Sequence, residues 1–198
     1  LVVAYPAIQE ARKQYPNSRV CFITAPVGLQ TLELMGFEQE EIFLISMSSL
    51  SGMFLDLIKI RKKFRGKSVS AIVLEPFTRI SALLTVWIGA SQRIGCFRFC
   101  NEGSYIGNFL THRIVFNPHL HASQTYFALS KALSKPISTQ PLLKDKILSQ
   151  MPNRLKINIQ VDDQKALQNR LKLEFPETAM EKIILLNANA SDIVPLRK

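Results

Sequence analysis

The chain has 198 residues, of which 47% are hydrophobic, and its 25 Lys and Arg outnumber its 15 Asp and Glu, for a net charge of +10. This balance excludes a disordered, collagen-like or disulfide-stapled protein and leaves ample material for a hydrophobic core. The positive charge favours polyanions, anionic membrane surfaces or phosphorylated ligands as partners.

The first part of the chain alternates helical and strand patterns. Pro6 suits the first position of a helix that runs to Tyr15. Strands are expected at 19–24 and 41–45, because both segments are short and apolar. A short helix that Gly36 closes is expected between them.

A basic amphipathic helix is predicted at 52–65. Its apolar residues recur at helical spacing and form one face: Met53, Leu57, Ile60 and Phe64. The other face and the residues just beyond it carry a dense group of cations: Lys59, Arg61, Lys62, Lys63, Arg65 and Lys67.

Three interpretations of these cations stay open: a solvated helix face, a contact with anionic lipid headgroups and, ranked lowest, a contact with nucleic acid. A basic residue near such a lipid surface contributes about 1 kcal/mol. The membrane alternative predicts that one group of cations faces the bilayer: Lys59, Lys62, Lys63 and Arg65. Nucleic acid is not expected as a partner, because no interleaved aromatic residues provide a stacking platform.

The middle of the chain continues the alternation. Residues 70–74 form an apolar run of strand length, and the helix expected after it carries Trp87, which we interpret as a core residue. Strands are expected at 93–96 and 113–116, separated by an irregular segment. A helix over 119–133 follows.

The last part begins with a surface connection at 135–141 and an extended segment at 155–159. A helix is predicted at 162–175 and a final strand at 182–187. Strands that alternate with helices and are apolar on both faces imply a doubly wound, mostly parallel α/β sheet.

The three cysteines, Cys21, Cys96 and Cys100, form an odd set with no CxxC spacing and no second pair to complete a zinc site. A reducing, cytoplasmic setting is the simplest interpretation. No stretch approaches the roughly 20 apolar residues of a membrane span, so any membrane association should be peripheral.

Ligands of open α/β sheets bind at the carboxyl ends of the strands, so the loops there are the candidate sites. One such loop holds Glu75, Thr78 and Arg79, between a strand and a helix. It is interpreted either as a turn with a salt bridge at the helix start or as a loop that contacts an acceptor.

A second candidate loop, 187–192, follows the last predicted strand. Small residues there let backbone N–H groups approach an anion, Ser191 offers a hydroxyl, and Arg197 and Lys198 would neutralise a diphosphate. An ordinary Asx-rich loop is the alternative. His112, His119 and His121 are interpreted as capping or surface residues.

Several segments, taken in order, resemble glycosyltransferase family 9, the group that contains the lipopolysaccharide heptosyltransferases. Residues 1–8 (LVVAYPAI) are similar to the stretch that follows the family's Gly-Asp loop. Residues 71–79 and 81–95 resemble its strand, its helix and its "GA..RIG" signature, and 184–198 resembles the start of its nucleotide-sugar domain.

The resemblance implies a doubly wound, Rossmann-like α/β fold, that of the N-terminal domain of a GT-B glycosyltransferase, truncated at both ends. Residues 1–152 would form the acceptor-side domain without its first strand. Residues 153–198 would form a linker helix and the first strand of an incomplete nucleotide-sugar domain. The family's catalytic Asp would lie just before Leu1, so the chain is expected to lack the base and to be inactive alone.

The resemblance also implies a reaction and its partners. Family members use no metal and transfer heptose or a similar sugar, with inversion, from a nucleotide-diphosphate donor such as ADP-heptose to a glycolipid or lipopolysaccharide-type acceptor. Ser191, Arg197 and Lys198 match the loop that contacts the donor diphosphate, and the loop from Glu75 to Arg79 is expected on the acceptor side. Such a bacterial enzyme would be cytoplasmic, peripheral to the inner face of the plasma membrane.

Two alternatives from the residues stay open. One is a non-catalytic basic α/β module that binds anionic membrane or nucleic acid through the helix at 52–65; its binding would be salt-sensitive and would need no second domain. The other is a different GT-B-like enzyme, such as a sugar-nucleotide epimerase.

Overall fold

The computed structural model describes residues 1–46, 48–75, 79–98, 108–137, 141–142 and 161–176. The chain divides into two compact units, Leu1–Ile157 and Asn158–Lys198. The described part of the second unit is dominated by one helix, α6 (Val161–Glu174), close to the predicted bounds. The strand predicted at 182–187 and the extended segment at 155–159 lie outside the described residues.

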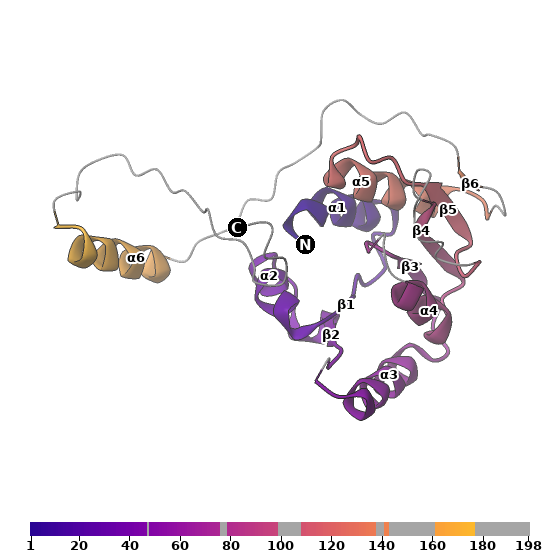
Figure 1. Cartoon of the computed structure of the whole chain (residues 1–198), viewed down its shortest axis with the longest axis horizontal. Helices are drawn as coiled ribbons and strands as arrows, with labels where there is room; N and C mark the ends of the chain where they lie inside the picture. The colour runs from indigo at the N-terminus through magenta and orange to yellow at the C-terminus, as the bar shows by residue number, and fades with distance from the viewer. Residues whose placement is uncertain (47, 76–78, 99–107, 138–140, 143–160, 177–198) are drawn as a thin grey trace, which may run out of the picture. The chain divides into compact units, whose positions relative to one another are not determined.

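Helices and strands alternate along the first unit, as the sequence predicts (Figure 1). Its α-helices are α1 (Tyr5–Gln14), α2 (Leu29–Leu34), α3 (Leu50–Phe64), α4 (Arg79–Trp87) and α5 (Ala122–Lys131). Its strands are β1 (Phe22–Thr24), β2 (Ile42–Leu44), β3 (Ser70–Ile72), β4 (Gln92–Arg98), β5 (His112–Val115) and β6 (Pro141–Leu142). Short 3-10 turns complete it: η1 (Val2–Ala4), η2 (Pro26–Gly28), η3 (Gln39–Glu41) and η4 (Ala132–Ser134).

The strands form two parallel sheets, β1–β2 and β3–β4–β5–β6. Phe22 lies opposite Ile42 in the first sheet. In the second, Ile72 lies opposite Ile94 and Ile94 opposite His112. Within the described residues, the strands of one sheet are not paired with those of the other. The expectation of parallel strands is therefore confirmed, with the sheet divided after β2.

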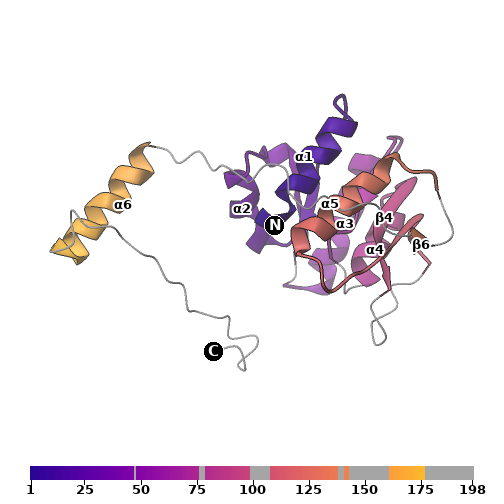
Figure 2. The ribbon, with the colours of Figure 1, turned by 90° about the horizontal axis from the view of Figure 1, so that it is seen from above.

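Side chains on β3 and just beyond it alternate between two helical layers, because successive residues of an extended chain point to opposite faces. Ile72 and Leu74 pack in the cluster that α1 and α5 cover, whereas Ala71 and Val73 pack toward α3 and α4. Helices α1 and α5 lie side by side on the first face (Figures 1 and 2), joined by an ion pair of 2.9 Å between Glu10 and Lys131. Helices on both faces make the fold doubly wound.

An apolar cluster bridges the two sheets, and we call it the bridging cluster. Its buried members are Ile60 of α3 together with Ile88 and Ala90, which follow α4. Ile23 of β1 packs against it from the first sheet, and Ala71 of β3 packs against it from the second. The two sheets thus share a core although their strands are not hydrogen-bonded to each other.

Two boundaries differ from the predictions at the end of the second sheet. Residues Pro141–Leu142, expected in a surface connection, form the edge strand β6 and pair with β5. Proline is compatible with this place, because an edge strand leaves one side of its backbone unpaired. Helix α5 begins after His121 and not at His119, since the His121 side chain caps it by accepting a hydrogen bond from the Ser123 N–H.

The interpretation of Trp87 as a core residue is wrong. The residue is 36% exposed, and its indole Nε1 donates a hydrogen bond of 3.1 Å to the carbonyl oxygen of Leu57 on α3. Leu84 of α4 and Ile88, which follows the helix, pack into the bridging cluster. Helical spacing shows which side of a helix is apolar, but on α4 this apolar side is wider than the surface that the neighbouring elements cover.

We predict that Ile60→Ala destabilises the protein by about 2 to 4 kcal/mol, because it leaves a cavity where the two sheets meet. Leu55→Ala is the matched control on the same helix; Leu55 is exposed, and its loss should change the free energy of unfolding by less than about 0.5 kcal/mol. Urea unfolding followed by circular dichroism measures both. Equal losses for the two variants would contradict the bridging role of Ile60.

Candidate functional site

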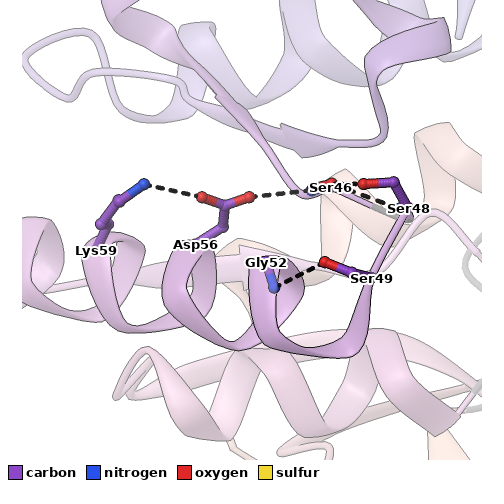
Figure 3. Close-up of polar contacts among 6 residues, drawn as sticks. All are labelled: Ser46, Ser48, Ser49, Gly52, Asp56 and Lys59. Atoms are coloured by element: carbon purple, nitrogen blue, oxygen red, sulfur yellow. Dashed lines mark hydrogen bonds and ion pairs between the residues drawn. The ribbon is translucent and has the colours of Figure 1, made fainter.

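The end of β2 and the start of α3 form a polar cluster. We call it the β2–α3 junction and define it by six residues, drawn in Figure 3: Ser46, Ser48, Ser49, Gly52, Asp56 and Lys59. The carboxyl ends of parallel strands are where open α/β sheets bind ligands, so the junction is a candidate site by its position.

Serine hydroxyls organise the loop of the junction. The Ser49 hydroxyl accepts a hydrogen bond of 3.1 Å from the Gly52 N–H and so caps α3. The Ser46 and Ser48 hydroxyls lie 2.8 Å apart and are hydrogen-bonded to each other. Hydroxyls of this kind both donate and accept hydrogen bonds, which suits the recognition of polar groups such as sugar hydroxyls.

Asp56 ties the strand end to the helix. Its carboxylate accepts a hydrogen bond from the Ser46 N–H and another from the Lys59 ammonium group, both at 3.1 Å (Figure 3). The Ser46 N–H is the largest cause of the lowered pKa of Asp56, and Lys59 adds to it. A carboxylate held ionised in this way is a poor proton acceptor, so its role is to position the loop.

Sequence reasoning missed the junction. The signal was present, because four serines between residues 46 and 51 stand between a strand and an amphipathic helix. A serine just before a helix predicts a cap. The contact between Asp56 and Ser46 has no such local signal, since ten residues separate them.

A shallow groove lies beside the junction. Its lining combines apolar residues of β2 and α3 with charges of both signs: Gln39, Glu40, Ile42, Phe43, Leu44, Asp56, Lys59, Ile60 and Lys63. Glu40 also pairs with Arg19 at 3.1 Å. The mixture of carboxylates and ammonium groups does not favour an isolated phosphate in this groove.

The predicted basic face of α3 is exposed, and the structure divides it. Lys59 and Lys63 line the groove, and Lys59 pairs with Asp56. Lys62 and Arg65 are exposed and do not line the groove. A contact of these four cations with a membrane stays a prediction.

The predicted acceptor loop is described at both of its ends. Glu75 accepts a hydrogen bond from the Ser81 hydroxyl in the first turn of α4, and Arg79 is the exposed first residue of that helix. Thr78 lies outside the described residues. The structure thus brings the Glu75 carboxylate to a helix start, where the helix dipole favours negative charge.

The predicted donor loop lies outside the described residues. Its three site residues, Ser191, Arg197 and Lys198, belong to the undescribed segment 177–198. Their role as a diphosphate site stays a prediction.

Two histidines have structural roles. His121 caps α5, as a capping residue should. His112 is fully buried on β5, so its interpretation as a capping or surface residue is wrong. Its Nε2 lies 3.0 Å from the Lys135 carbonyl oxygen and its Nδ1 2.9 Å from the Thr111 hydroxyl. Because a carbonyl oxygen only accepts, we assign the proton to Nε2.

The described residues offer no nucleophilic or metal-binding cluster. Burial raises the pKa of the Cys96 thiol to about 12 and also raises that of Cys21, which disfavours the reactive thiolate of both. Among the residues that the structure describes, no group of three or more His, Cys, Asp or Glu could hold a metal ion. Within the same residues, every helix falls short of the length and apolar character that crossing a membrane requires.

Comparison with known proteins gives a likeness of fold. No family model matches the sequence, and no curated protein matches it. A solved structure described as E. coli ADP-heptose lps heptosyltransferase II resembles this chain with a TM-score of 0.55 and 14% sequence identity. The likeness covers 86% of this chain and 46% of that one, so this chain spans about half the length of its structural neighbour. The α/β fold is similar to the GT-B glycosyltransferase fold, as expected.

We predict that Asp56→Ala lowers the urea midpoint of unfolding at pH 7, because it frees the end of β2 from α3. The pKa of Asp56 is lower in the folded chain than its ordinary value of 3.8, so its contribution to stability is present above that value and is lost as the pH falls through the folded pKa. The gap between wild type and variant should therefore narrow progressively as the pH falls below about 4.

The control for this prediction is Glu33→Ala, which removes an exposed carboxylate on α2. Its urea midpoint should follow that of the wild type from pH 7 to pH 3. A gap for Asp56→Ala that stays constant over this range would contradict an electrostatic role of the carboxylate.

Proposed function

We propose that this chain forms the acceptor-side domain of an inverting glycosyltransferase. The enzyme would transfer heptose or a similar sugar from a nucleotide-diphosphate donor, such as ADP-heptose, to a glycolipid or lipopolysaccharide-type acceptor. The observation that carries the proposal is the likeness of fold to the heptosyltransferase over 86% of the chain. It agrees with the order of the motifs that resemble glycosyltransferase family 9.

The acceptor would bind at the carboxyl ends of the strands. Glu75 and Arg79 stand between β3 and α4, as expected for residues that meet a ligand at this edge. A carboxylate accepts hydrogen bonds from sugar hydroxyls, and a guanidinium binds the phosphates of an inner-core acceptor in a bidentate manner. Thr78 completes the proposed acceptor loop.

The donor would bind through the loop that follows the last predicted strand. Ser191, Arg197 and Lys198 supply a hydroxyl and two cations for the diphosphate. Their effect on the rate would come from stabilising the negative charge that develops on the departing nucleotide diphosphate. This arrangement needs no metal ion.

The site of action would be the cytoplasmic face of a bacterial plasma membrane, where the lipid-anchored acceptor and the soluble donor meet. The net charge of +10 supports such a location, because the inner leaflet is rich in anionic lipids. Two exposed cations support it as well, Lys62 of α3 and Arg65 just after that helix.

The test is binding of a phosphorylated lipopolysaccharide inner-core oligosaccharide to the full 198-residue chain, measured by isothermal titration calorimetry without lipid. We predict that Arg79→Ala weakens binding about tenfold, the loss expected for one charge-assisted contact. Glu75→Gln should weaken it by a smaller factor, and removing the phosphates from the oligosaccharide should abolish the effect of Arg79→Ala.

Arg19→Ala is the matched control, because Arg19 precedes β1 and pairs with Glu40 away from the carboxyl end of that strand. It should bind the oligosaccharide as the wild type does. If the wild type binds neither form of the oligosaccharide, or if Arg19→Ala and Arg79→Ala lose affinity equally, the proposed acceptor site is wrong.

A further inference from the structure

The exposed face of α4 is apolar beyond its first residue, Arg79. Ile80 is 71% exposed, Leu83 46%, Val86 43% and Trp87 36%. These positions recur at spacings of three and four residues, so they form one stripe on the helix. A contiguous apolar stripe on the surface, in contrast to scattered apolar residues, marks an interaction site.

Helix α3 extends this stripe. The rings of Phe54 and Trp87 lie 6.4 Å apart, and the indole Nε1 of Trp87 donates to the Leu57 carbonyl oxygen, so the two helices are joined at this point. Leu50 lies one turn before Phe54, and both are exposed. We call the combined surface the α3–α4 apolar face and define it by Leu50, Phe54, Ile80, Leu83, Val86 and Trp87.

Cations border the apolar face at the C-terminal end of α3. The guanidinium carbon of Arg61 lies 4.9 Å from the centre of the Trp87 ring, and Arg61 also donates to the Trp87 carbonyl oxygen. Arg65 follows the last residue of α3, and Lys62 lies next to Arg61 in the chain. The two helices contain one acidic residue, Asp56, and the Ser46 N–H and Lys59 hold its carboxylate.

We infer that the α3–α4 apolar face docks on the surface of an anionic lipid bilayer. Its apolar side chains would enter the boundary between headgroups and acyl chains, while Arg61, Lys62 and Arg65 contact lipid phosphates. The inference specifies the surface through which the protein of the proposed function would contact its membrane. It rests on the proposed function only for the identity of that partner. The sequence predicts a membrane contact through the basic face of this helix, whereas the inferred contact is made by an apolar face that cations border.

Charge favours the bilayer over other partners. In a symmetric dimer the same patch meets itself, so the cations beside Trp87 would face those of a second copy that also carries a charge of +10. Nucleic acid would supply the opposite charge, but aliphatic residues such as Ile80 and Leu83 give bases no ring to stack on. An anionic bilayer complements both the apolar stripe and the cations.

Trp87 reports on this contact directly, because it is the only tryptophan of the chain. The experiment adds vesicles of phosphatidylglycerol and phosphatidylethanolamine to the full chain and follows tryptophan emission. We expect a shift to shorter wavelength, quenching by lipids with brominated acyl chains, and at least a tenfold weaker response with phosphatidylcholine vesicles or in high salt.

The test variant is Ile80→Ser/Leu83→Ser, which should reduce vesicle binding at least tenfold while its circular dichroism spectrum stays that of the wild type. The control is Val27→Ser/Leu34→Ser, which changes two exposed apolar residues outside the α3–α4 apolar face and should bind vesicles as the wild type does.

Three results would overturn the inference: no emission shift with anionic vesicles, equal vesicle binding by the test and control variants, or a shift that follows protein concentration or duplex DNA in place of lipid. The oligosaccharide titration above uses no lipid. A failure of membrane docking is therefore distinguishable from a failure of the proposed transferase function.

Discussion

Burial of Ile60 where the two sheets meet is the constraint on which the rest of the first unit depends. Ile23 from one sheet and Ala71 from the other pack against the same buried cluster. Backbone hydrogen bonds do not join these sheets in the part of the chain that the structure describes. Side-chain packing therefore holds the two sheets together, and α3 contributes a central part of that packing.

Helix α3 connects the core to the β2–α3 junction and to the α3–α4 apolar face. Its first turn is capped by Ser49, and Asp56 holds the end of β2. Its buried side anchors the bridging cluster through Ile60, and its exposed side meets Trp87 of α4. One helix thus carries residues of both the β2–α3 junction and the α3–α4 apolar face.

The likeness to a heptosyltransferase shows a similar fold, whereas any chemistry depends on the residues of the loops. Folds of this kind serve many reactions, so function has to be argued from the residues at the strand ends. Glu75 and Arg79 provide an acid and a cation at one such end. The proposed diphosphate-binding role of Ser191, Arg197 and Lys198 rests on the sequence pattern alone. The cap of α5 and the thiols with raised pKa are structural features that need no ligand.

The sequence by itself determined the order of helices and strands, the amphipathic character of α3 and the doubly wound class, because hydrophobic period and capping residues are local signals. Only the tertiary structure decided that the sheet divides after β2, that Asp56 binds the Ser46 N–H, that His112 is buried and that Trp87 is exposed. Each of these depends on which distant element covers a residue. A periodic pattern shows which stripe of a helix is apolar, but the width of stripe that becomes buried is set by the neighbours that pack against it.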